Sequence, residues 1–349
     1  MRRRDHLIIT VDYELFGNGT GCVDPCLCEP LERMARLVEQ YGGRLEIFVE
    51  ALEFLAMEKE PVFADALAAV KRQLLDMVQR GHRLQVHIHP QWQHAVFSDG
   101  RWTFPDATWR TGDVPEADLN QLVNDAVAWI RGIAPSGPEP WVFRAGGWCV
   151  QPLAQVEPVL RAARIRGESS FAPGLVNRDA VAWYDFRQCP SAPWWPLNSS
   201  VRAEADSAMI EIPIAVGRVN PLRHLRERVR RKREGEFAPG CQGAYRGRGP
   251  SWQRLAAMLH RARAARLAML DVCALPAEML IAIIRGWQLR FGASDSALPI
   301  VAIAHTKNFS SVAELELESL LHWVDAQEQI TLSTYAGWHA EQFEEGEAA

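Results

Sequence analysis

Short apolar runs along the chain alternate with stretches in which apolar residues recur every three or four positions. The first pattern is typical of buried strands and the second of amphipathic helices. Between residues 29 and 43, Leu31, Met34, Leu37 and Val38 follow helical spacing before two glycines end the segment. The expected strands are 6–14, 44–50, 83–89, 141–146, 208–214, 267–273 and 299–305, with 165–170 and 330–334 as further candidates. The other expected helices are 63–80, 116–133, 151–164, 252–266, 276–290 and 311–325.

This alternation predicts an α/β fold with a parallel sheet, either doubly wound or closed as a barrel. The faces of the strands help to decide between the two. In "RLQVHIH", residues 83–89, leucine, valine and isoleucine share one face, whereas glutamine and two histidines share the other. Strands buried on both sides would be apolar on both faces. Polar side chains near the carboxyl ends of the strands are what an active site at the top of a barrel requires, so we expect a barrel.

Composition narrows the possible classes of protein. The chain has 349 residues, of which 48% are hydrophobic and 23% charged, as in soluble globular proteins. A formal net charge of -5 argues against a general nucleic-acid binder. No apolar run approaches the roughly eighteen residues of a membrane span. The seven cysteines are widely spread and odd in number, which favours reduced thiols and a cytoplasmic location.

One segment interrupts the alternation. Residues 223–250, "RHLRERVRRKREGEFAPGCQGAYRGRGP", are rich in arginine and glycine. We therefore expect a single domain over residues 1–349 with an Arg/Gly-rich insertion near 218–250. The insertion is either a cover over an anionic substrate such as a diphosphate, or a solvated helix and loop.

Reactive side chains gather at the ends of four predicted strands. On one strand, His87 and His89 would project from the same face about 6.6–7 Å apart, close enough to share one metal ion at roughly 2.0–2.1 Å per bond. Two histidines and one carboxylate make an open zinc-type site. A second carboxylate can then act as general base and another histidine as general acid. The residues in question are Asp12, Glu14, His87, His89, Arg144 and His305.

The stretches "TVDYE", "GHRLQVHIHP", "FRAGG" and "IAH" resemble successive motifs of the polysaccharide deacetylase family (NodB homology, carbohydrate esterase 4). The resemblance runs from residue 7 to about 335 and is closest to the WalW-type branch of intracellular proteins linked to surface-polysaccharide synthesis. It implies a distorted (β/α)7 barrel of the glycoside hydrolase/deacetylase type. It also implies a divalent metal, zinc first, with nickel, cobalt or manganese as alternatives. The family's base falls on Asp12 and its first metal histidine on His87.

The chain departs from the family pattern in two places. Tyr13 stands where the family has a second aspartate, and a strand turns it away from Asp12. Glu14 is therefore the better candidate for the third metal ligand, with Asp12 as the alternative. The histidines are two positions apart, whereas the family separates them by four. The aspartate that supports the catalytic histidine His305 is either Asp185 or Asp271.

These observations predict a metal-dependent hydrolase that removes an N-acetyl or related acyl group from an amino sugar or a sugar-containing precursor. Asp12 would be the base, Arg144 would hold it ionised, and His305 would protonate the leaving amine. A catalytically silent barrel that binds a sugar or a partner enzyme is the alternative, and a glycosidase using paired carboxylates is a third possibility. Four tryptophans are either core residues or platforms for the sugar. They are Trp92, Trp148, Trp194 and Trp195.

Overall fold

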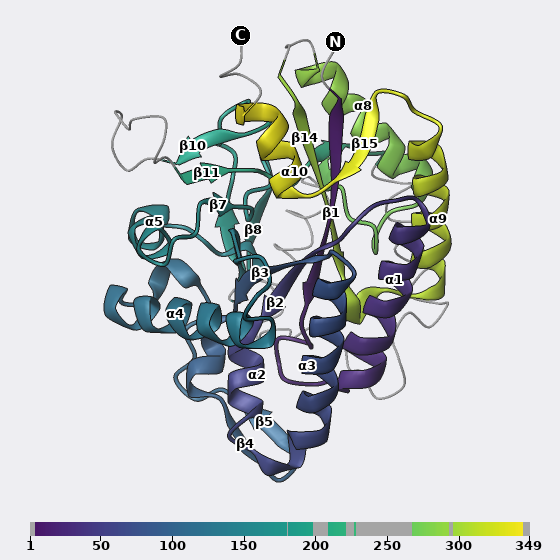
Figure 1. The fold of residues 1–349 in the computed structure, drawn as a ribbon. Helices are drawn as coiled ribbons and strands as arrows, with labels where there is room; N and C mark the ends of the chain where they lie inside the picture. Colours follow the sequence, from purple (N-terminus) through teal and green to yellow (C-terminus); the bar gives the residue numbers. More distant parts are fainter. Residues whose placement is uncertain are drawn as a thin grey trace.

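A computed structural model describes residues 4–179, 181–197, 209–220, 227, 267–292 and 296–344. Its centre is a nine-stranded sheet in the order β10-β11-β7-β6-β3-β2-β1-β14, with β15 also paired to β1 (Figure 1). All described pairs in this sheet are parallel except β10 with β11. The strands are β1 (Asp5–Tyr13), β2 (Glu46–Glu50), β3 (Arg83–Ile88), β6 (Val142–Ala145), β7 (Gly167–Glu168), β10 (Trp195–Leu197), β11 (Met209–Glu211), β14 (Leu298–His305) and β15 (Ile330–Ser333).

The sheet curls until its two sides approach each other. Backbone bridges link Ile214, just past β11, to Val301 of β14, and Asp271 to Ile303 of the same strand. The predicted α/β barrel is therefore confirmed as a curled, largely parallel sheet. Three short antiparallel pairs lie beside it, namely β4 (Val96–Ser98) with β5 (Arg101–Thr103), β8 (Val176–Arg178) with β9 (Trp183–Asp185), and β12 (Val216–Arg218) with β13 (Leu267–Met269).

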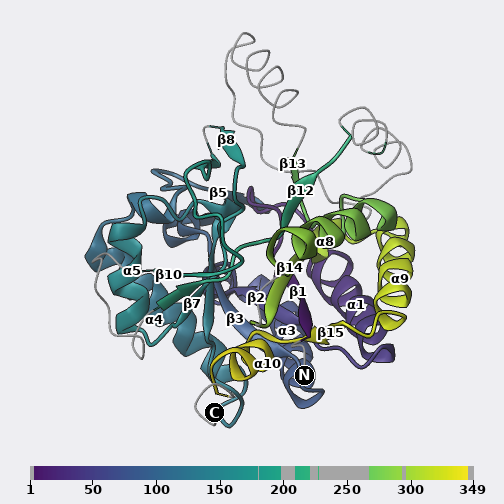
Figure 2. The ribbon, with the colours of Figure 1, turned by 90° about the horizontal axis from the view of Figure 1, so that it is seen from above.

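Helices cover the outside of the sheet, and the view from above shows them on both sides of the central strands (Figure 2). Their inward faces carry the apolar stripe that the sequence shows, as in α1, where Leu31, Met34 and Val38 are fully buried. None of the described helices is long and apolar enough to cross a membrane. The helices are α1 (Glu29–Gln40), α2 (Ala51–Met57), α3 (Ala64–Gln79), α4 (Glu116–Ile133), α5 (Leu153–Ala162), α8 (Ala277–Phe291), α9 (Ser311–Asp325) and α10 (Tyr335–His339).

Some expectations differ from the structure. The predicted strand 267–273 is only partly regular, because β13 leaves the main sheet to pair with β12 and only Asp271 bridges back to β14. The expectation of reduced thiols is wrong for Cys26, which is disulfide-bonded, whereas Cys22 and Cys28 are free. The predicted helix 252–266 and almost all of the predicted insertion lie outside the described residues.

The barrel interior contains a buried carboxyl group on β2. Glu46 is fully buried and accepts hydrogen bonds from the Gln85 side chain (2.6 Å) and the Tyr335 backbone N–H (2.7 Å). Burial outweighs these bonds and raises the pKa of Glu46 to about 7. The folded protein therefore binds the proton of the Glu46 carboxyl group more tightly than the unfolded chain does. The contribution of this proton to the stability of the fold is complete below pH 4.5 and is lost as pH rises through about 7.

Glu46→Gln is therefore expected to flatten the dependence of stability on pH. The free energy of unfolding of the variant should fall by about 2–3 kcal/mol less than that of the wild type between about pH 5 and about pH 8. Urea unfolding of both proteins at the two pH values measures this difference. Parallel pH curves would show that Glu46 does not titrate in this range.

Candidate metal centre

Strand register brings the predicted reactive residues to one end of the barrel. Asp12 lies opposite His305 in the β1–β14 ladder. Glu50, His87 and Arg144 lie opposite one another across β2, β3 and β6. All five residues are at or near the carboxyl ends of their strands, so parallel pairing alone places them side by side.

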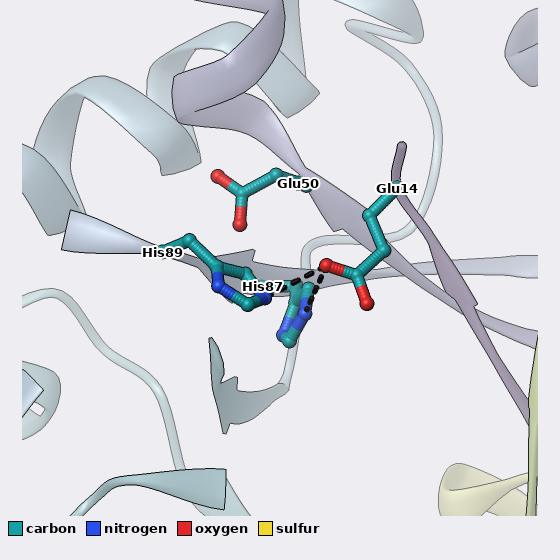
Figure 3. Close-up of side chains that lie close together, drawn as sticks. All are labelled: Glu14, Glu50, His87 and His89. Atoms are coloured by element: carbon teal, nitrogen blue, oxygen red, sulfur yellow. Dashed lines mark ion pairs between the residues drawn. The ribbon is translucent and has the colours of Figure 1, made fainter. Parts of the chain in front are cut away.

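His87, His89 and Glu14 converge on one point (Figure 3). Glu14 Oε2 lies 2.7 Å from His89 Nε2 and 3.6 Å from His87 Nε2. The two imidazole rings have centroids 5.0 Å apart and are nearly perpendicular. All three side chains are largely removed from solvent. His89 keeps extended backbone angles one residue past β3, which is why both histidines face the same side.

The hydrogen bonding of His87 suits a metal ligand. Its Nδ1 lies 2.8 Å from the backbone carbonyl oxygen of Arg144, which can only accept a hydrogen bond, so Nδ1 carries a proton. In the neutral ring Nε2 then presents a lone pair, and this buried atom has no hydrogen-bond partner among the described residues. A ring nitrogen and a carboxylate oxygen that face each other in this way can bind one cation between them. The donor set therefore fits a divalent metal of the zinc type.

Glu50 is a fourth potential ligand that the sequence analysis did not select. Its carboxyl group lies beside Glu14 and the two histidines. One potential donor atom from each of the four side chains lies within 4.8 Å of the other three (Figure 3). One oxygen accepts a hydrogen bond from Leu52 N–H, whereas Oε2 is buried without a partner in the described part of the chain. Burial, together with the nearby Glu53 and Glu14, raises the pKa of Glu50 well above its usual value. Its position at the carboxyl end of a predicted strand was the feature that could have identified it.

Asp12 lies beside this group and is held by Arg144. The guanidinium of Arg144 donates to Asp12 Oδ1 at 2.6 Å, to Thr10 Oγ1 at 2.9 Å and to the Ser169 carbonyl at 2.8 Å. It is fully buried and stacks over the Phe48 ring. Although burial favours the neutral acid, Arg144 and two histidines hold the pKa of Asp12 below its usual value. Asp12 is therefore an ionised carboxylate.

His305 approaches Asp12 from the neighbouring strand. Its Nε2 lies 3.4 Å from Asp12 Oδ2 and 3.9 Å from Glu14 Oε1. Its Nδ1 is buried and makes no hydrogen bond within the described residues, so neither aspartate considered as its support is bonded to it. Asp185 instead pairs with Arg187 and Arg178, and Asp271 accepts a hydrogen bond from Cys273 N–H.

The four tryptophans lie in different places. Trp148 packs edge-on against the His305 ring, with centroids 5.9 Å apart. Trp92 is 2% exposed and lies against Trp102, which leaves it no free face for a sugar. Trp194 and Trp195 do not lie beside the histidines. Trp194 packs on Trp338, near the amino end of β14, and Trp195 belongs to β10 and contacts Phe171.

Gly146, directly after β6, leaves room for the His89 ring. A Cβ at this position would lie 2.4 Å from His89 Cγ, so Gly146→Ala should force the ring away from Glu14. We expect metal binding to weaken by about 10–100-fold, as when other supports of a metal ligand are lost. Titration with zinc against a chromophoric chelator measures this change. Gly286→Ala in α8 is the control, because a Cβ there meets no atom within 4 Å. Unchanged affinity in Gly146→Ala would show that the position of His89 does not matter for the metal.

Comparison with known proteins supports the fold. No protein-family model matches the sequence, and no curated protein matches it. A probable polysaccharide deacetylase from Pseudomonas aeruginosa PAO1 is similar over 97% of this chain and 92% of its own, with 11% identity and a TM-score of 0.50. A 4-α-glucanotransferase from Thermococcus litoralis is similar over 98% of this chain, with 11% identity and a TM-score of 0.51. The present chain spans 41% of that enzyme. At this level of identity the likeness shows a shared barrel fold.

Proposed function

We propose that this protein is a metal-dependent hydrolase that removes an N-acetyl or related acyl group from an amino sugar in polysaccharide or glycoconjugate biosynthesis. The observation that carries the proposal is the convergence of His87 Nε2, His89 Nε2 and Glu14 Oε2 beside an ionised Asp12. The similarity to a probable polysaccharide deacetylase supports it. The proposal includes zinc as the metal, the WalW-type branch, a single domain and a cytoplasmic location.

Each residue of the site has its own role in the proposed reaction. When bound by His87, His89 and Glu14, a divalent ion would polarise the acyl carbonyl and stabilise the oxyanion. Asp12, kept ionised by Arg144, accepts the proton of the attacking water. His305, whose Nε2 lies 3.4 Å from Asp12 Oδ2, delivers a proton to the leaving amine. Trp148 packs edge-on against the His305 ring and keeps it in place.

The charge states of Asp12 and Glu14 argue against a glycosidase that uses these two carboxyl groups as its catalytic pair. Such enzymes need one carboxyl group that is protonated at working pH and a second that is ionised. Asp12 and Glu14 are close together, but the pKa of each lies below its usual value, since Arg144 acts on one and Lys307 on the other. Neither of this pair can serve as the acid.

A catalytically silent binding barrel is the second candidate. The observation that favours it is the ammonium group of Lys307, which lies 2.8 Å from Glu14 Oε1 and already neutralises this carboxylate. Sugar-binding titrations on wild type and Asp12→Asn separate the two functions. A silent barrel should show similar affinity in both proteins and no turnover in either.

The metal ligands provide the direct test of the hydrolase. Wild-type protein incubated with zinc, nickel, cobalt or manganese should retain one ion and release acetate from N-acetylglucosamine oligomers. His87→Ala and His89→Ala should each weaken metal binding by more than about 100-fold, since removing even an indirect support costs 10–100-fold. Elemental analysis and the chelator titration measure this, with circular dichroism to check the fold. Exposed His94, mutated to Ala, is the matched control. A wild-type protein with neither bound metal nor acetate release would refute the proposal.

A further inference from the structure

Lys307 is a partly buried cation directly beside the candidate metal centre. It belongs to the short 3-10 turn Thr306–Asn308 that follows β14. Its Nζ lies 2.8 Å from Glu14 Oε1 and 3.0 Å from the carbonyl oxygen of Leu15. The side chain is only 12% exposed. The ammonium group is thus fixed in place and largely shielded from solvent.

The two oxygens of Glu14 have different partners. Oε2 points at His87 and His89, whereas Oε1 points away from them, as Figure 3 shows, and receives the Lys307 ammonium. An isolated carboxylate at this depth would be very costly. Among the described residues, Lys307 is the one ion-pair partner of Glu14 that is not a histidine.

We propose that Lys307 is an internal counter-ion of the metal centre, which stabilises the metal-free protein and weakens metal binding. This inference rests on the proposed function, because it assumes that Glu14 is a ligand. Once a divalent ion binds Oε2, the same carboxylate has a cation on either side. The two cations are then a few ångströms apart and repel each other, and largely buried charges are poorly screened.

A different role would have the opposite effect on metal binding. If Lys307 served only to orient Glu14 through its hydrogen bond, its removal would free the carboxylate and weaken metal binding. Two substitutions separate charge from hydrogen bonding. Lys307→Met removes both, whereas Lys307→Gln removes the charge and keeps an N–H donor.

The first measurement is zinc affinity, determined against a chromophoric chelator. If Lys307 is a counter-ion, its charge weakens zinc binding. Both variants should therefore bind zinc at least about tenfold more tightly than the wild type does. Lys71→Met is the matched control, because Lys71 forms a comparable pair with Glu58 at the surface, 2.6 Å apart. Its zinc affinity should equal that of the wild type.

The second measurement needs no metal. With zinc removed by a chelator, Lys307→Met and Lys307→Gln should unfold at a lower temperature than wild type, since Glu14 then lacks its cation. Saturating zinc should raise the unfolding temperature of both variants more than that of the wild type, because they bind the ion more tightly.

The outcomes separate this inference from the proposed function. If wild type binds no zinc, the proposed metal centre is wrong, whatever the variants do. If wild type binds zinc and the variants bind it equally or more weakly, the metal centre stands and the counter-ion role is refuted. A metal-free Lys307→Met protein as stable as wild type would also refute it.

Discussion

Replacing Asp12 by asparagine is expected to slow amide hydrolysis by about 10²–10⁴-fold, the usual contribution of a general base. Asparagine keeps the size of the side chain and one oxygen for Arg144, but it cannot accept the proton of the attacking water. The loss should fall on kcat, because Asp12 lies outside the group of Glu14, Glu50, His87 and His89 and forms a second group with Glu14 and His305. Steady-state kinetics on an N-acetylglucosamine oligomer measure the effect.

Metal content is the control for this variant. Asp12→Asn should retain the zinc affinity of the wild type within a few-fold, whereas Glu14→Gln should lose most of it. If Asp12→Asn loses zinc as completely as Glu14→Gln, then Asp12 is a ligand and some other group is the base. If it retains both zinc and full activity, Asp12 has no part in catalysis.

Arg144→Met is expected to cost about 3–5 kcal/mol of stability, the usual result of breaking a buried ion pair by removing one partner. Arg144 is fully buried, and its guanidinium bonds Asp12, Thr10 and the Ser169 carbonyl. Methionine retains part of the contact with Phe48 but leaves the Asp12 charge unpaired. Urea unfolding at neutral pH measures the change.

A double-mutant cycle isolates the ion pair. In the Asp12→Asn background no buried negative charge is left behind, so Arg144→Met should cost clearly less than in wild type. The difference should also shrink in acid. Because the folded pKa of Asp12 is lowered, the contribution of the pair is present above the unfolded value of 3.8 and is lost as pH falls through the folded value. Equal costs in both backgrounds would show that the charge of Asp12 is irrelevant to stability.

The main elements of the barrel could be predicted from the chain because their patterns are long. The segments 6–14, 83–89 and 299–305 are β1, β3 and β14 within one residue at each end. Parallel pairing then requires their polar carboxyl ends to meet at one edge. For this reason the approach of Glu14 to His87 on one side and to Asp12 on the other follows from strand assignment alone. The roles of these residues remain predictions.

Depth within the barrel could not be predicted from the chain. Glu46 and Glu50 share one face of β2 and look alike in sequence, yet Glu46 bonds to Gln85 and Tyr335, while Glu50 faces the histidines. Lys307 lies in a turn, where lysine is ordinarily solvated. Its ammonium group is enclosed by contacts with a distant segment, since it bonds the Leu15 carbonyl and lies over the Phe16 ring. The position of Trp194 could not be predicted either, because the residue that it packs against, Trp338, is 144 positions away in the sequence.

The ladder register has a consequence for how such a site can change over evolutionary time. Glu50, His87 and Arg144 form one row across three strands, and Asp12 and His305 form another pair at the same end. Side chains alternate along a strand, so inserting or deleting one residue inside β3 would turn both histidines out of the barrel together. Changes of length in the connecting loops would leave both rows intact. Insertions and deletions that leave the site intact should therefore fall in the connecting loops and not inside β3.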